Sequence, residues 1–128
     1  FRAAGSMSGV LNLEDTRLKS SDIPKVLGPY TPENKNYTNE SALNRLDYYA
    51  EQIAGKDIPN ERIMIISCGK SDGLAKSAHS FAQKCDSLNI KNILIMSPGN
   101  HTWPHWVYSL DLHLFHFSRI ARGMHLGY

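Results

Sequence analysis

The sequence lacks the features that mark several specialised classes of protein. It has two cysteines in 128 residues, too few for the disulfide framework of a small secreted domain. Its formal net charge of +2 is too small to indicate a nucleic-acid partner. No apolar run reaches the roughly 18 residues of a membrane span, and no glycine-rich loop opens a helix as a phosphate site requires. The hydrophobic content of 41% is ordinary for a globular protein, which argues against disorder.

What the sequence does contain is an alternation of strands and helices. Short apolar runs predict strands, and apolar residues at i, i+3 and i+4 predict helices. The expected elements are a strand over 2–8, an irregular stretch over 10–38 with a helical turn near 23–27, a helix over 39–54, a strand over 62–67, a helix over 73–88, a strand over 92–96 and a helix over 104–121. Such alternation produces parallel strands joined by right-handed crossovers. We predict an α/β fold with helices on both faces of a parallel sheet, a three-layer sandwich.

The first expected strand suggests a domain larger than this chain. Its small residues Ala3, Ala4 and Gly5 are typical of a tightly packed interior strand, which has neighbours on both edges. Three strands alone do not make a stable open parallel sheet with both faces covered. We therefore expect residues 1–128 to be the C-terminal part of a single domain. Its N-terminal half, or another chain, would pair with the first strand.

Two polar residues follow the second and third expected strands. Asp72 lies just past the strand over 62–67, and His101 lies just past the strand over 92–96. Sites in open α/β sheets gather at the carboxyl ends of the strands, so both residues start from the same edge. Taken singly, Asp72 is a candidate helix N-cap, and His101 is a candidate loop or core histidine whose ring nitrogens are hydrogen-bonded for structural reasons. Taken together, they match in order the last two members of the Ser–Asp–His triad of α/β hydrolases.

The sequence contains no convincing nucleophile for this triad. The segment Gly5–Gly9 is close to the Gly-x-Ser-x-Gly elbow, but its central residue is Met7 and no helix start follows, so neither Ser6 nor Ser8 qualifies. Cys68 ends an apolar strand without a nearby cation to lower the pKa of its thiol. Cys85 should lie roughly 18 Å from the level of Cys68, at ~1.5 Å rise per helical residue, too far for a disulfide.

Other candidate site residues are aromatic. Trp103 and Trp106, beside His101, are expected to pack or to line a substrate pocket.

His113 and His116 are spaced i, i+3 on the last helix and could in principle ligate a metal. No third ligand completes a set at convincing spacing, so packing or solvation is favoured. We predict neither a metal nor a cofactor.

Three segments of the chain resemble one known family, the esterase D/feruloyl esterase-like α/β hydrolases of carbohydrate esterase family 1 type. Residues 1–11, FRAAGSMSGVL, are similar to the strand after the nucleophile helix. Residues 68–72, CGKSD, resemble the segment that carries the triad acid. Residues 98–106, PGNHTWPHW, resemble the segment that carries the triad histidine and are the most specific of the three. The resemblance covers almost the whole chain but only the C-terminal half of the family's domain.

The resemblance implies a serine esterase that cleaves carboxylic esters. Asp72 would be the triad acid and His101 the general base, while the serine nucleophile and the oxyanion-hole donors would precede Phe1. The implied substrate is a small-molecule or carbohydrate-linked ester, with no nucleic acid, membrane or cofactor involved. The sequence does not separate a cytoplasmic from a secreted or periplasmic location.

Two other interpretations remain open at this point. The chain could be a non-catalytic α/β relic or interaction module of flavodoxin-like shape, which would account for the missing nucleophile. It could also belong to an acyltransferase, because the resembled family includes mycolyltransferases. A Gly-x-Ser-x-Gly motif encoded upstream of Phe1 would favour the esterase.

Overall fold

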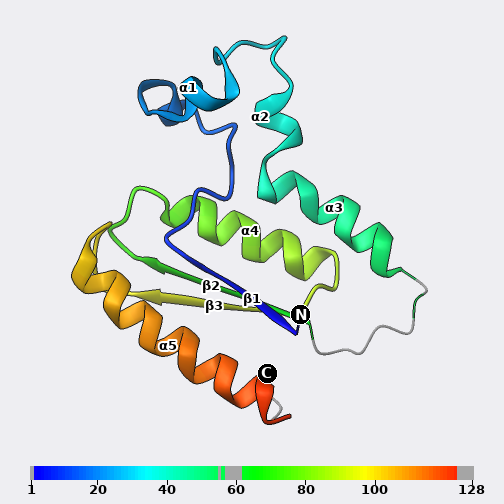
Figure 1. Ribbon diagram of the computed structural model, residues 1–128, viewed down its shortest axis with the longest axis vertical. Coiled ribbons are helices and arrows are strands. Elements are labelled where there is room, and N and C mark those ends of the chain that lie inside the picture. The colour runs from blue at the N-terminus through cyan, green and yellow to red at the C-terminus, as the bar shows by residue number, and fades with distance from the viewer. Residues whose placement is uncertain (1, 55, 57–61, 124–128) are drawn as a thin grey trace.

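The computed structural model describes residues 2–54, 56 and 62–123, so Phe1 of the first motif lies outside the described residues. Figure 1 shows the order of the elements along the chain. They are β1 (Ala3–Met7), the 3-10 helix η1 (Thr16–Ser20), α1 (Ile23–Leu27), α2 (Asn36–Asn39), α3 (Ala42–Ile53), β2 (Ile63–Gly69), α4 (Ala75–Ser87), β3 (Asn92–Ser97) and α5 (Trp103–Ala121). Every strand and helix predicted from periodicity is present, with ends shifted by at most three residues.

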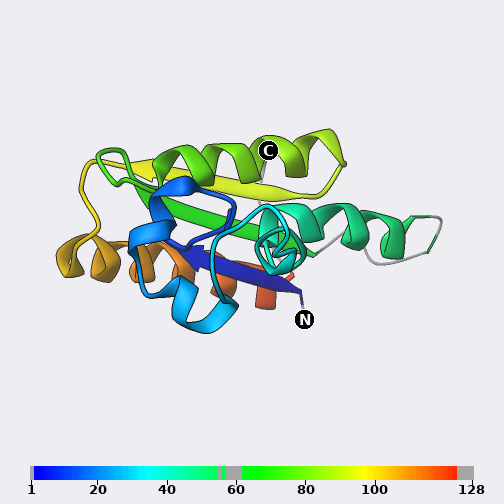
Figure 2. The same ribbon diagram turned by 90° about the horizontal axis from the view of Figure 1, so that it is seen from above.

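The three strands form one parallel sheet in the order β1-β2-β3. Gly5 of β1 pairs with Ile65 of β2, and Ile66 of β2 pairs with Leu94 of β3. Helix α4 covers one face with α3 packed against it, and α5 crosses the other face (Figures 1 and 2). The predicted α/β arrangement is confirmed. Because all strands run the same way, their carboxyl ends share one edge of the sheet.

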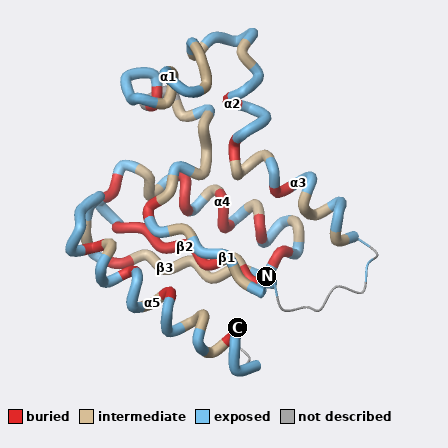
Figure 3. Tube along the Cα trace, in the orientation of Figure 1, coloured by how far each residue is buried: buried red, intermediate tan, exposed pale blue. Residues whose placement is uncertain are grey.

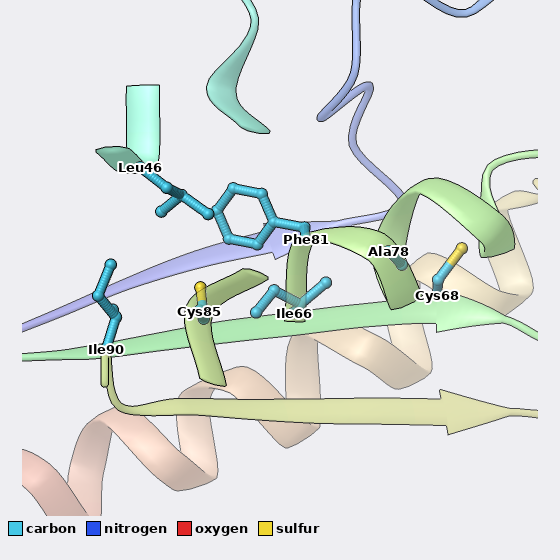
Figure 4. Close-up of a cluster of buried hydrophobic side chains, with 7 residues drawn as sticks. All are labelled: Leu46, Ile66, Cys68, Ala78, Phe81, Cys85 and Ile90. Atoms are coloured by element: carbon cyan, nitrogen blue, oxygen red, sulfur yellow. The ribbon is translucent and has the colours of Figure 1, made fainter. Parts of the chain in front are cut away.

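The main core lies between the sheet and α4. Along β2, Ile66 and Cys68 point toward α4, while Ile63 and Ile65 point toward α5, as the alternation of a strand requires. Figure 4 shows the α4 side of this core, in which Phe81 reaches across to Leu46 of α3. The buried face of α4 includes Ala78, Phe81, Ala82 and Cys85, which follow the i, i+3 and i+4 spacing that predicted this helix.

β1 is less covered than its small residues suggest. Ala4, Gly5 and Met7 are exposed, and within the described ranges β1 pairs only with β2 (Figure 3). Helix α5 is also unusual, because its inward side carries His105, Ser109 and His113. Its outward side bears exposed apolar residues, namely Trp103, Val107, Leu110 and Leu114. A strand edge and an apolar helix face are therefore both uncovered.

The stretch after β1 is more ordered than expected. The predicted helical turn is α1, but η1 and α2 were not anticipated, since helices of four or five residues carry too little periodicity to detect. Ser41 stands at the N-cap of α3, but its hydroxyl accepts a hydrogen bond from the Leu13 backbone N–H at 3.2 Å instead of capping the helix. None of the helices in the described part of the chain is long and apolar enough to cross a membrane.

Candidate active site

The candidate site is built from the loops that leave β2 and β3. The Lys70 N–H donates to the Ser97 carbonyl at 2.8 Å, and the Ser71 N–H donates to the Gly99 carbonyl at 3.0 Å. At Gly69 a side chain is excluded, because a Cβ there would lie 2.3 Å from the Gly99 oxygen. This backbone contact holds the loop of Asp72 against the loop of His101. The sequence interpretation did not single out Gly69 or Gly99, because the contact exists only after the strands have paired.

Asp72 and His101 meet directly. The Nδ1 atom of His101 lies 2.9 Å from Oδ2 of Asp72, so the prediction that they share one edge of the sheet is confirmed. The other carboxylate oxygen, Oδ1, accepts the Leu74 N–H at 2.8 Å at the start of α4. Asp72 therefore serves the helix start and the histidine at once. Its side chain is 1% exposed, whereas that of His101 is 52% exposed.

The surroundings of Asp72 favour its ionised form. Burial alone would raise the pKa of the carboxyl group, but hydrogen bonds from the Leu74 N–H and from His101 outweigh it and lower the pKa. An ionised carboxylate can only accept hydrogen bonds, so His101 presents Nδ1–H to it. The lone pair of the neutral imidazole then lies on Nε2, which can take up a proton.

Aromatic side chains flank the histidine. The Trp106 ring meets the His101 ring edge to face, with centroids 4.8 Å apart, and Trp103 meets Trp106 in the same manner at 5.1 Å. Such pairs restrict ring orientation and contribute about 0.5–1.5 kcal/mol each beyond the area that they bury. Trp103 is 75% exposed, so its ring is free to contact another molecule.

The serines and cysteines considered from the sequence are not placed as nucleophiles. Ser8 lies at the end of β1 in the left-handed region (φ 54°), and its buried hydroxyl has no geometrically acceptable hydrogen-bond partner. The Ser6 hydroxyl packs against Gly9. Cys68 is completely buried, and burial, followed by the charge of Asp72, raises the pKa of its thiol. Both cysteines are free, as expected.

His105 and His113, on the inward side of α5, are buried and have hydroxyl partners. His113 Nε2 lies 2.9 Å from the Ser67 hydroxyl in the interior, and His105 Nε2 lies 3.3 Å from the Ser109 hydroxyl. Burial, followed by the nearby His116, lowers the pKa of His113. Within residues 2–54, 56 and 62–123, no group of three or more His, Cys, Asp or Glu side chains is arranged to hold a metal ion.

Several solved structures are similar to this chain in fold. A ferulic acid esterase superposes with a TM-score of 0.63 at 19% identity. The fluorophosphonate-binding serine hydrolase FphF of Staphylococcus aureus superposes with a TM-score of 0.68, also at 19% identity. The chain has part of an α/β-hydrolase fold. The S-formylglutathione hydrolase FrmB of Staphylococcus aureus superposes with a TM-score of 0.61 at 19% identity. No family model and no curated protein sequence matches the chain.

The matches differ in how much of each protein they include. They cover 94%, 90% and 90% of this chain but only 42%, 44% and 40% of the ferulic acid esterase, FphF and FrmB, respectively. The chain thus spans less than half of the length of each of these structures.

Proposed function

We propose that this chain supplies the acid and the base of a serine carboxylesterase of the feruloyl or acetyl esterase type. The observation that carries the proposal is the buried Asp72 carboxylate at 2.9 Å from Nδ1 of a half-exposed His101. The pair lies at the carboxyl edge of a parallel sheet, where such folds build their sites. The similarity in fold to a ferulic acid esterase and to serine hydrolases supports the same reaction class.

The proposed reaction passes one proton through His101. The serine oxygen attacks the ester carbonyl carbon while the serine proton moves to His101 Nε2, and Asp72 stabilises the resulting imidazolium. As the carbon–oxygen bond to the alcohol breaks, Nε2 returns the proton to the leaving oxygen. Water then attacks the acyl-enzyme in the same way, with His101 taking its proton and returning it to the serine oxygen, and the carboxylic acid is released. If a second alcohol took the place of water, the enzyme would be the acyltransferase considered from the sequence.

The serine and the oxyanion-hole donors come from outside this chain in the proposal. Residues 1–128 are then the C-terminal part of one α/β-hydrolase domain, and the remaining part pairs with the uncovered edge of β1. The outward apolar residues of α5, Val107, Leu110 and Leu114, are a second surface for that part to cover. Burying apolar area contributes about 25 cal/mol per Å², which favours such docking.

Trp103 and Trp106 have separate roles in the proposed site. Trp106 holds the His101 ring by its edge-to-face contact. Trp103, with most of its surface exposed, contacts the substrate at the entrance. Its flat apolar ring suits the ring of an aromatic acyl group or of a sugar-linked ester.

The test is hydrolysis of p-nitrophenyl acetate by the full-length protein that contains these residues. His101→Ala is expected to lower kcat by several orders of magnitude, because the members of a triad act as a unit. His79→Ala is the matched control, since His79 is exposed on α4 and lies outside the proposed site. Equal rates for His101→Ala and His79→Ala would refute the proposed base.

A non-catalytic α/β module is the second candidate. It is favoured by one observation, that the Ser8 hydroxyl is buried without a hydrogen-bond partner and that Cys68 and Cys85 are fully buried, so none of the three is hydrogen-bonded to His101. The upstream coding sequence distinguishes the two candidates. A Gly-x-Ser-x-Gly motif there supports the esterase, and its absence together with an inactive full-length protein supports the module.

A further inference from the structure

A buried histidine at the start of α5 lies against the loop that carries His101. His105 is 5% exposed and stands in the first turn of α5, which begins near the edge where β2 and β3 end (Figure 1). The segment 98–106 contains both His101 and His105, and only His101 takes part in the proposed reaction. Burying a polar ring costs free energy unless it is hydrogen-bonded, so the contacts of this imidazole identify its role.

The His105 ring packs against Gly99. A Cβ at Gly99 would lie 2.8 Å from Nδ1 of His105 and 3.2 Å from its Cγ, so the imidazole leaves no room for a side chain there. Gly99 also has a φ of 140°, a backbone conformation that residues with a Cβ rarely adopt. Its carbonyl oxygen contacts β2, because a Cβ at Gly69 would lie 2.3 Å from that oxygen. Gly99 is therefore held by Gly69 at its carbonyl and by His105 at its Cα.

Gly99 links the two loops of the proposed pair. Its carbonyl accepts the Ser71 N–H at 3.0 Å, and Ser71 directly precedes Asp72. On the other loop, His101 follows Gly99 closely in the sequence and places its Nδ1 2.9 Å from Oδ2 of Asp72. A displacement of Gly99 would therefore change the separation of Asp72 and His101.

The His105 ring is itself held by the first turns of α5. The hydroxyl of Ser109, a residue that is 1% exposed, lies 3.3 Å from Nε2 of His105. The helix start is joined to the preceding loop by two backbone hydrogen bonds. The Trp106 N–H donates to the Thr102 carbonyl at 3.1 Å, and the Thr102 N–H donates to the Asn100 carbonyl at 2.9 Å. The buried side of this helix start is thus a fixed support for the loop.

We propose that His105 is a positioning residue, which acts through Gly99 to keep His101 within hydrogen-bond distance of Asp72. The inference rests on the proposed esterase function. His105 does not touch the reacting atoms, and its Nε2 faces Ser109 inside the protein. Misplacing a catalytic group by about 1 Å can cost on the order of 10²-fold in rate. Loss of the His105 ring should therefore lower kcat and leave KM nearly unchanged.

The test compares His105→Ala with His113→Ala in the full-length protein, with p-nitrophenyl acetate as the substrate. Both are buried histidines on the inward side of α5 with a hydroxyl partner, so both substitutions should lower the free energy of unfolding by similar amounts. His105→Ala should lower kcat about 10–100-fold, whereas His113→Ala should keep kcat within about threefold of wild type. Equal kcat values for the two folded variants, or a loss in His105→Ala confined to KM, would overturn the proposal.

A second measurement reads the pair without relying on esterase activity. In full-length protein with isotope-labelled histidine, the NMR shifts of the His101 ring nitrogens report which nitrogen carries the proton of the neutral imidazole. Wild type should show the Nδ1–H form, and His105→Ala should show a mixture of Nδ1–H and Nε2–H forms, because the ring is no longer held to Asp72. If wild type shows the Nδ1–H form without ester hydrolysis, the proposed function alone fails. If wild type hydrolyses the ester and His105→Ala keeps the pure Nδ1–H form, the positioning role alone fails.

A further variant covers the case in which His105→Ala does not fold. Ser109→Ala removes the hydroxyl beside Nε2 and leaves the His105 ring present but without that partner. This change should lower kcat by about threefold or more, because the ring is no longer fixed by a hydrogen bond. An unchanged kcat in folded Ser109→Ala would count against the role assigned to His105.

Discussion

Replacing Asp72 by Asn is the sharpest test of the proposed pair. The amide keeps the shape of the carboxylate, and its Oδ1 can still accept the Leu74 N–H, so the start of α4 is preserved. The group facing His101 becomes an NH₂, which donates. His101 Nδ1 must then accept, which places the ring proton on Nε2, where the proposed reaction needs a lone pair.

The size of the effect follows from losing the correct tautomer and the countercharge. In a triad of this type the Asp-to-Asn change lowers kcat by about 10⁴-fold, equivalent to about 5.4 kcal/mol of transition-state stabilisation at about 1.36 kcal/mol per factor of ten. A loss of this size is expected here because the Asp72 side chain is 1% exposed, so water does not readily replace it. KM should change little, since Asp72 lies behind the histidine.

The assay is p-nitrophenyl acetate hydrolysis by the full-length protein, with circular dichroism to verify folding. The matched control is Asp47→Asn, because Asp47 is a more exposed carboxylate whose partner is Lys84. A surface ion pair contributes at most about 1 kcal/mol, so this control should remain active and folded. If a folded Asp72→Asn protein retains kcat within tenfold of wild type, the role assigned to Asp72 is wrong.

Two further predictions concern stability, measured by urea unfolding of the full-length protein. Gly5→Ala should cost about 1–3 kcal/mol, because a Cβ at that position would lie 2.4 Å from His113 Nδ1; a variant as stable as wild type would show that β1 and α5 do not pack as described. Burial, followed by the nearby His116, lowers the folded-state pKa of His113 below 6.5, so the unfolded chain binds the proton more readily. The free energy of unfolding should therefore be highest above pH 6.5 and decrease as the pH is lowered below 6.5, by up to about 1.4 kcal/mol per pH unit. His113→Gln should reduce that dependence between pH 7 and 5, and an identical pH profile in wild type and variant would contradict this assignment.

Local patterns alone were enough to predict the scaffold. The apolar runs at Ile63–Ser67 and Ile93–Met96 and the helical spacing of Ala78, Phe81, Ala82 and Cys85 predicted the order of elements and the buried face of α4. These patterns predict the elements because side chains on one face recur every two residues in a strand and every 3.6 residues in a helix. The rule that parallel strands end at one edge then predicted that Asp72 and His101 would lie near each other.

The tertiary structure decided the contacts between distant segments. The approach of Gly69 to the Gly99 carbonyl, the His113 ring against Gly5 and the inward polar side of α5 depend on strand register and helix rotation, which no local pattern encodes. The sequence by itself determined which residues carry the proposed chemistry. Packing determined their separation, burial and ionisation, because these depend on neighbours that come together only when the chain folds.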